Sequence, residues 1–305
     1  MITNYGSRVR SSDKIHDLCG VVYLPKGEAK GIFHIVHGMT EHIARYEWIM
    51  TALAENGYIA CGYDNLGHGN TANEGEHGFI ASENGYDLLA RDVKEFSDAV
   101  KNAHGKDLPY ILMGHSMGSF IVRYAALKYV TPDKLIIMGT GGKNPLAGMG
   151  LAVMGAIKAF KGERHVSALA YSLAFGAYNK RFTEVCENDP SPWLTTDKAV
   201  REKYYADKYC TFKFTVSAMR DLIRLLKITN SGAWFKGIDK NMPILLVSGA
   251  EDPVGNYGKG VRQVENRLKK AGADVKAVIY EGARHEILND FVKEDVKKDI
   301  LEFIK

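Results

Sequence analysis

Six short apolar runs, separated by longer amphipathic stretches, constrain the fold of this chain more than any other feature. Each run holds about five to eight strand-like residues, and the runs lie at residues 31–38, 58–65, 109–116, 134–140, 243–249 and 275–282. Helical apolar spacing occupies residues 45–57, 86–105, 118–130 and 258–272, and glycines suited to helix C-caps close several of these stretches. Strands that are apolar on both faces and alternate with helices predict a doubly wound α/β fold, a mostly parallel sheet with helices on both faces.

The alternation of strands and helices is interrupted between Gly142 and Ser231. This stretch opens with a segment rich in Met, Gly and Ala at 146–160, continues as helical and aromatic sequence, and gives way to the strand pattern again at Met242. Its helices either cover the sheet in the ordinary way or form a cap inserted over the strand ends. Because the strand pattern resumes, we expect the insertion. The predicted domains are a core of residues 1–141 and 232–305 and a helical cap (lid) of residues 142–231.

Composition and charge limit the kinds of molecule that this protein is expected to bind. The chain is 46% hydrophobic and 25% charged, and its 40 basic and 36 acidic residues nearly balance, as in an ordinary globular protein. The basic residues are dispersed, so we expect no nucleic acid partner. The N-terminus lacks the apolar core of a signal peptide, and residues 146–160 are too short and glycine-rich to span a bilayer. We expect a cytoplasmic protein with four free thiols, Cys19, Cys61, Cys186 and Cys210.

The apolar run at 109–116 ends in Gly-His-Ser-Met-Gly, which places Ser116 between Gly114 and Gly118. A G-x-S-x-G sequence between a strand and an amphipathic helix is typical of a sharp turn that exposes the serine hydroxyl. The helix that follows offers backbone N–H groups to a developing anion. We therefore predict that Ser116 is a nucleophile.

A serine hydroxyl needs a neighbouring base that is itself oriented by a carboxylate. Asp252 follows the apolar run at 243–249, and His285 lies in the loop after the run at 275–282. Taken singly, Asp252 is equally a turn residue before a proline, and His285 a surface histidine. Together, the order Ser, Asp, His, with each residue after a strand, is that expected for an α/β-hydrolase. We predict that Ser116, Asp252 and His285 form a catalytic triad.

The same architecture takes its second oxyanion donor from the loop after an early strand. His37-Gly38-Met39 begins that loop, so the backbone N–H groups of Met39 and Met117 are the predicted oxyanion hole. His37 and His115 flank the site, and we expect them to pack or hydrogen-bond beneath it. His68 and His77 lack the ligand spacing of a metal site and indicate a structured polar loop. With no Walker or dinucleotide-binding motif in the chain, we expect neither cofactor nor metal.

The segments HGMTEHIARY, DNLGHGNT, GHSMGS, GAEDPV and RHEILND, with PWLTTDKAVREKYYADKYCTFKFT in the cap, resemble the monoacylglycerol lipase and lysophospholipase branch of the α/β-hydrolases. The resemblance covers nearly the whole chain. It implies a serine hydrolase that acts on small-molecule acyl esters, with an apolar tunnel for the acyl chain under the cap. It assigns the nucleophile to Ser116, the acid to Asp252, the base to His285 and the oxyanion donors to Met39 and Met117.

Two parts of the chain leave alternatives open. Met39-Thr40 replaces the small residues of many relatives, and nearby Glu41 and Arg45 either bind a polar head group such as glycerol or form a structural ion pair. The segment 146–160 fits an acyl-chain wall, a lid that touches membranes or micelles, or plain packing on the core.

Two other functions are weighed. One is an aminopeptidase or amidase, disfavoured by the absence of a Gly-Gly-Pro-Gly-like loop; the other is a ligand sensor without turnover.

Overall fold

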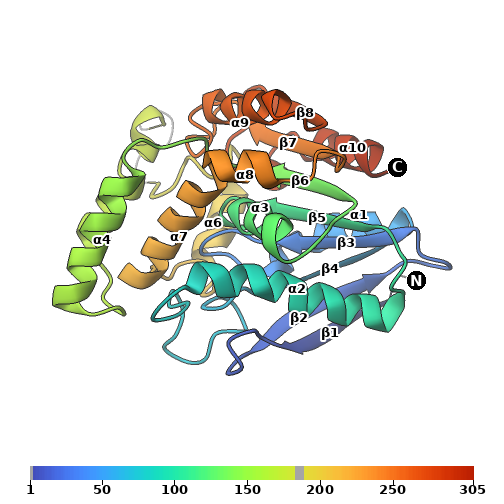
Figure 1. Ribbon diagram of the computed structural model, residues 1–305, viewed down its shortest axis with the longest axis horizontal. Helices are drawn as coiled ribbons and strands as arrows, with labels where there is room; N and C mark the ends of the chain where they lie inside the picture. Colours follow the sequence, from blue (N-terminus) through green and yellow to red (C-terminus); the bar gives the residue numbers. More distant parts are fainter. Residues whose placement is uncertain (1–2, 183–188) are drawn as a thin grey trace.

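The computed structural model of the protein describes residues 3–182 and 189–305, so Cys186 lies outside the described residues. Its strands are β1 (Thr3–Arg10), β2 (Asp17–Leu24), β3 (Gly31–Val36), β4 (Tyr58–Tyr63), β5 (Tyr110–His115), β6 (Lys134–Met138), β7 (Ile244–Gly249) and β8 (Val275–Tyr280). Over the described residues they form one eight-stranded sheet in the order β1-β2-β4-β3-β5-β6-β7-β8 (Figure 1).

The sheet is parallel from β4 to β8, and β1 and β2 join it in antiparallel fashion. The six apolar runs of the sequence are β3 to β8, and the prediction of a mostly parallel sheet is confirmed. Four of these strands, β3, β4, β5 and β7, are buried along their whole length. The sequence analysis did not predict β1 and β2. Residues 4–10 of β1 are exposed or partly buried, and β2 buries only Leu18, Val22 and Tyr23.

Helices cover both faces of the sheet. On one face, α1 (Glu47–Glu55) and α10 (Lys293–Ile304) pack against side chains such as Phe33, Met113 and Ile136. On the other face, α2 (Gly85–His104), α3 (Met117–Lys128) and α9 (Lys259–Lys270) pack against Leu112 and Leu246. Side chains of neighbouring strand residues point to opposite faces, so the sheet separates two hydrophobic cores. The doubly wound α/β fold is confirmed.

The chain between β6 and β7 is helical. It contains α4 (Ala147–Lys161), α5 (Ala168–Phe175), the short 3₁₀ turn η2 (Tyr178–Arg181), α6 (Lys198–Ala206), α7 (Val216–Thr229) and α8 (Gly232–Gly237). In Figure 1, α4 projects at the left edge of the molecule beside α7. Helix α4 packs on α7, and α7 packs in turn on α2 and α3 of the core. The division at residues 142 and 231 stays a prediction.

The helices α4 and α5 leave an apolar surface exposed. Met154 and Ala170 are buried, whereas six large apolar residues nearby in the chain are exposed: Leu146, Met149, Phe160, Val166, Leu169 and Leu173. Among the residues that the structure describes, no helix has the length and apolarity needed to cross a bilayer.

Candidate active site

Ser116 stands at a sharp turn between β5 and α3. Its φ of 54° and ψ of −118° lie in a region that side chains with a Cβ rarely adopt. The flanking glycines permit the turn, because each lies too close to another backbone segment to carry a side chain. A Cβ on Gly114 would lie 2.2 Å from the Gly118 carbonyl oxygen, and one on Gly118 would lie 2.0 Å from that of Val36. Any larger residue at either position would force the turn apart.

The loop after β3 packs directly against this turn. A Cβ on Gly38 would lie 2.9 Å from the Cβ of Ser116, so the two backbones are in close contact. The Gly38 N–H donates to Glu41 at 2.6 Å, which fixes the start of the loop. Neither the Met39 N–H nor the Met117 N–H donates a hydrogen bond to another described residue. Two main-chain donors beside Ser116 are therefore available to a ligand.

Asp252 and His285 follow β7 and β8 and meet at the same edge of the sheet. His285 Nδ1 lies 3.0 Å from Asp252 Oδ2, an ion-pair distance without hydrogen-bond geometry, and both side chains are buried. The Val254 N–H donates to the other carboxylate oxygen of Asp252 at 2.8 Å, and the Ser248 hydroxyl donates to Oδ2 at 3.3 Å. The carboxylate is thus held in place by donors on both of its oxygens.

Strand β6 connects Ser116 with His285. The Ser116 N–H donates to the carbonyl of Met138 at 3.0 Å. The next residue, Gly139, lies against the histidine, since a Cβ there would be 3.1 Å from His285 Cε1. The imidazole also packs against the rings of His115 and Trp193, with centroids 4.7 Å and 5.1 Å away. The structure therefore places Ser116, Asp252 and His285 after the carboxyl ends of β5, β7 and β8, with β6 between β5 and β7.

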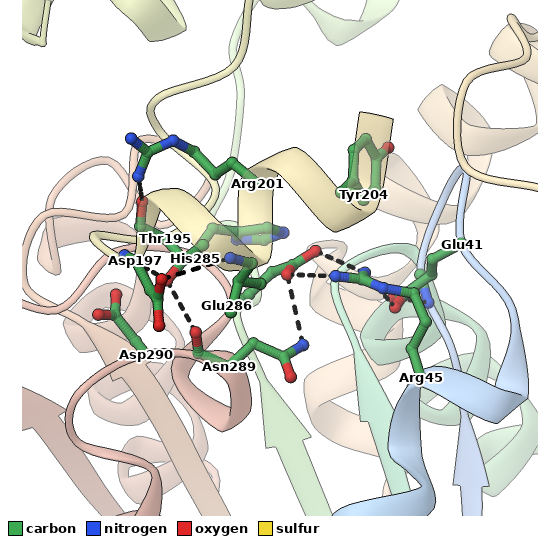
Figure 2. A network of polar contacts seen from close by, with 12 residues as sticks. Glu41, Arg45, Thr195, Asp197, Arg201, Tyr204, His285, Glu286, Asn289 and Asp290 are labelled. Atoms are coloured by element: carbon green, nitrogen blue, oxygen red, sulfur yellow. Dashed lines mark hydrogen bonds and ion pairs between the residues drawn. The ribbon is translucent and has the colours of Figure 1, made fainter. Parts of the chain in front are cut away.

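Glu41 and Arg45 are engaged by protein partners (Figure 2). Glu41 is 4% exposed, and its Oε1 accepts hydrogen bonds from Gly38 N–H, Tyr46 O–H and His115 Nδ1. Arg45 donates to both oxygens of Glu286, at 2.7 Å each, and to Glu41 at 3.2 Å. These contacts favour the structural ion pair over the head-group site, the two alternatives that the sequence leaves open.

His115 acts as a charged link in this network. Its Nδ1 lies 3.0 Å from Glu41 and its Nε2 lies 3.3 Å from the carbonyl of His285, so both nitrogens face acceptors and must donate. Burial disfavours the charged ring, but the hydrogen bond and negative charge of Glu41 outweigh it and raise the pKa of His115. Burial by itself raises the pKa of the Glu41 carboxyl. The hydrogen bond and charge of His115 and the charge of Arg45 outweigh burial, so this pKa is lowered.

The segment before α6 holds the loop of the candidate base. The N–H groups of His285 and Glu286 donate to the carbonyls of Trp193 and Leu194, at 3.4 Å and 2.7 Å. Thr195 extends the contact by donating its hydroxyl to the carbonyl of Asn289 at 2.8 Å, and Figure 2 shows it above this loop. The sequence analysis assigned no role to Trp193 or Glu286. The only local signal is their place in the Trp-Leu and Arg-His-Glu segments that carry the resemblance.

The other histidines are bonded within loops near the site. His37 accepts from the Asn65 N–H at 2.9 Å and donates to the Gly38 carbonyl at 2.8 Å. His68 donates to the Leu66 carbonyl and His77 to the Gly69 carbonyl, each at 2.9 Å. Burial lowers the pKa of His68 to about 3, so its ring is neutral. These rings order the loops beneath and beside the nucleophile.

A large surface groove lies away from the three candidate catalytic residues. Its volume is about 1090 Å³, and its lining comes from α9, the end of β8 and the segment after β7. Arg181, Glu251 and Tyr257 line one end, but Ser116, Asp252 and His285 are not among its lining residues. This groove is therefore not the predicted acyl tunnel, which stays a prediction.

The sequence profile of the serine aminopeptidase S33 family (Hydrolase_4) matches residues 27–291. The chain belongs to this family. It is 24% identical to a monoacylglycerol lipase of Mycolicibacterium smegmatis over 97% of this chain and 98% of that protein. It also matches an uncharacterized abhydrolase domain-containing protein of Dictyostelium discoideum at 25% identity over its full length, although it spans only 29% of that relative.

Among solved structures, the chain is similar to a thermostable carboxyl esterase from Bacillus coagulans in complex with glycerol. The TM-score is 0.93 at 28% identity, and the alignment covers 100% of this chain and 98% of that one. The fold is therefore the α/β-hydrolase fold that the sequence predicts. Family and fold together make the chain a serine hydrolase of the esterase and lipase type.

Proposed function

We propose that the protein hydrolyses carboxylic esters of acyl lipids, such as monoacylglycerols and lysophospholipids, through Ser116, Asp252 and His285. The observation that carries the proposal is the 3.0 Å approach of His285 to Asp252 beside the half-buried elbow of Ser116. The similarity to a carboxyl esterase bound to glycerol and to a monoacylglycerol lipase supports this substrate class.

In the proposed mechanism, the Ser116 Oγ attacks the ester carbonyl carbon while His285 Nε2 takes the hydroxyl proton. Asp252 holds the imidazole by Nδ1 and stabilises the imidazolium that forms. The main-chain N–H groups of Met39 and Met117 donate to the oxyanion, because neither has a partner within the described residues. His285 then gives its proton to the leaving alcohol, and an acyl ester remains on Ser116.

Water completes the cycle. His285 takes a proton from the water as its oxygen attacks the acyl carbonyl, and the same two N–H groups stabilise the second oxyanion. The carboxylic acid leaves, and the proton returns to Ser116. No cofactor or metal ion takes part in these steps.

The cap, residues 142–231, is the proposed acyl-binding element. The exposed apolar side chains of α4 and α5, among them Met149, Phe160 and Leu173, suit transient contact with a membrane or micelle. The exposed Lys161 at the end of α4 would lie near anionic head groups, whereas Lys158 is paired with Glu83. A cytoplasmic enzyme with such a surface would collect sparingly soluble lipid esters from a lipid phase.

A matched substrate series tests the proposal. We expect multiple turnovers on monoacylglycerols and on p-nitrophenyl esters from acetyl to palmitoyl, with no comparable rate on aminoacyl p-nitroanilides. Hydrolysis of neither esters nor monoacylglycerols by the wild type would overturn it. A single stoichiometric release of p-nitrophenol, without further turnover, would instead indicate a covalent ligand sensor.

The second candidate is an aminopeptidase or amidase, which the description of the matching family favours. An aminopeptidase needs acceptors for the free amino group of its substrate. Glu41 and Glu286, the buried carboxylates close to the site, are already paired with Arg45. Preferential cleavage of the p-nitroanilides would establish this candidate in place of the esterase.

A further inference from the structure

Three side chains with metal-binding atoms converge between the loop after β3 and the end of α6. They are His42, Asp207 and Cys210, and their ligand atoms all lie within 4.8 Å of one another. His42 Nε2 is 2.8 Å from Asp207 Oδ2, although the two residues are 165 positions apart in the chain. None of the three belongs to the candidate triad or to the oxyanion donors.

Main-chain contacts fix the geometry of the cluster before any ligand binds. The Cys210 N–H donates to the Asp207 carbonyl at 3.0 Å, so the Asp-x-x-Cys segment is folded into a turn. Asp207 Oδ1 accepts from the Tyr209 N–H at 2.8 Å, which leaves Oδ2 directed at His42. The Tyr209 ring packs on His42 at 5.7 Å, edge to face, and restricts rotation of the imidazole.

The sulfur of Cys210 has no competing partner. It makes no hydrogen bond to another described residue, and Cys210 is a free thiol that is 2% exposed. Asp207 and His42 are more open, so the cluster is reached from solvent on their side. The three ligand atoms lie close enough together for one small cation to contact all of them.

The charges around the sulfur also favour a cation. Asp207, Glu41 and Glu286 all act on Cys210 as negative charges, while Arg45 acts on it as a positive one. Arg45 is itself neutralised by its paired contact with Glu286. Because Arg45 and Glu286 offset each other, the charge that a dication meets beside the sulfur is mainly that of Asp207, which is attractive.

We propose that His42, Asp207 and Cys210 form a binding site for a divalent transition metal ion of the zinc class. Imidazole nitrogen, carboxylate oxygen and thiolate sulfur are the donors that Zn²⁺ takes in proteins, and three of them leave a fourth position for water. Binding releases the thiol proton of Cys210 to solvent, and the sulfur becomes the third protein ligand.

The site joins two elements that both touch the candidate active centre. His42 follows the oxyanion loop, and Asp207 directly follows α6, whose Tyr204 donates to the Thr40 carbonyl at 3.0 Å. A bound metal ion fastens the cap to the oxyanion loop. It therefore stabilises the folded chain by mass action, and its effect does not depend on which ester, if any, the enzyme cleaves.

Calorimetric titration of the untagged, EDTA-treated full chain with Zn²⁺ tests the proposal. We expect one strong site in the wild type, a melting temperature that rises with Zn²⁺, and a loss of roughly tenfold or more in affinity in Cys210→Ser and in His42→Gln. Cys19→Ser, which removes a half-buried thiol elsewhere, should bind Zn²⁺ as the wild type does. Co²⁺ in place of Zn²⁺ should give the charge-transfer absorption of a thiolate ligand.

Equal Zn²⁺ affinity in the wild type, Cys210→Ser and His42→Gln would overturn the proposal. A Co²⁺ complex without thiolate absorption would do the same. Should Cys210→Ser fail to fold, His42→Gln and Asp207→Asn provide the same comparison with the sulfur retained. Because the readouts are metal affinity and melting temperature, an inactive esterase would leave this test intact.

Discussion

Arg45 and Glu286 are joined by two parallel hydrogen bonds, each 2.7 Å long, in a buried environment. Glu286 directly follows the candidate base His285, and Arg45 lies on η1 (Ile43–Tyr46), just after the oxyanion loop. A planar guanidinium paired with both carboxylate oxygens fixes orientation as well as distance. The pair therefore sets the position of the His285 loop relative to the oxyanion donors.

Replacing Arg45 should destabilise the protein and slow catalysis together. Arg45→Met leaves Glu286 as a buried charge without its ion-pair partner, which costs about 3–5 kcal/mol in free energy of unfolding. Arg45→Lys keeps the charge but loses the paired geometry, so we expect an intermediate loss. Urea unfolding and ester kinetics measure both effects. The exposed pair of Lys198 with Glu202 supplies the control, since Lys198→Met should change stability by less than about 1 kcal/mol.

The head-group hypothesis for Arg45 makes a different prediction. If the guanidinium bound glycerol, Arg45→Met would raise KM for monoacylglycerols but not for methyl esters, which lack the glycerol group. The free energy of unfolding would stay unchanged. That pattern would contradict the structural role assigned to this residue.

Ser116 should store backbone strain that glycine releases. Its φ of 54° is unfavourable for residues with a Cβ and costs about 1–3 kcal/mol. Both Ser116→Ala and Ser116→Gly remove the hydroxyl, but only glycine adopts this conformation without penalty. We expect the Gly variant to unfold at a higher urea concentration than the Ala variant. Equal midpoints would show that the elbow is unstrained.

Two adjacent carboxylates, Glu251 and Asp252, should differ sharply in their effect on turnover. Asp252 is buried and lies 3.0 Å from His285, whereas Glu251 faces Arg181 at the surface. Asp252→Asn should lower kcat by a factor of about 10⁴, by analogy with other triads. Glu251→Gln, the matched neighbour, should leave kcat almost unchanged. Similar losses of kcat in the two variants would contradict the assignment of Asp252 as the acid of the triad.

The buried carboxyl of Asp92, which is not part of the candidate triad, should make the stability of the protein depend on pH. Its carboxyl is buried on α2 and accepts hydrogen bonds from Ser11 and Ser12, and burial raises its pKa from 3.8 to about 6. The folded state thus favours the neutral form. The stability that this carboxyl contributes is present below its unfolded pKa and is lost as pH rises through about 6.

Asp92→Asn removes this titration while keeping an acceptor for the Ser12 N–H. Relative to wild type, we expect the variant to gain stability between pH 4 and pH 8, by about 3 kcal/mol for a shift of roughly two pKa units. Urea unfolding at several pH values measures the difference. A difference between variant and wild type that stays constant over this range would contradict the assignment.

Much of the fold follows from local patterns, because a parallel strand buried on both faces must be apolar throughout. The runs that became β3 to β7 carry this signature, and the apolar run of β8 is only partly buried. The strand β1 escaped prediction for the same reason. Residues 4–10 of this strand are polar or charged apart from Tyr5, Gly6 and Val9, and they are exposed or only partly buried, so they show no apolar run.

The sequence also places Ser116, Asp252 and His285 after strands, where the structure has them, and their chemical roles stay predictions. The sequence did not predict contacts between distant segments. Nothing local to Arg45 reveals Glu286, which lies 241 residues away, and nothing local to His42 reveals Asp207. Such pairs depend on which strand ends and loops meet, and only the folded chain determines that.

Identification of the acylated residue tests the central claim most directly. The full chain would be incubated with a fluorophosphonate, and the adduct located by mass spectrometry of its peptides. The account predicts one adduct per chain, on Ser116, with loss of ester hydrolysis in proportion to labelling. An adduct on another residue, or full ester hydrolysis by a chain labelled at Ser116, would contradict it.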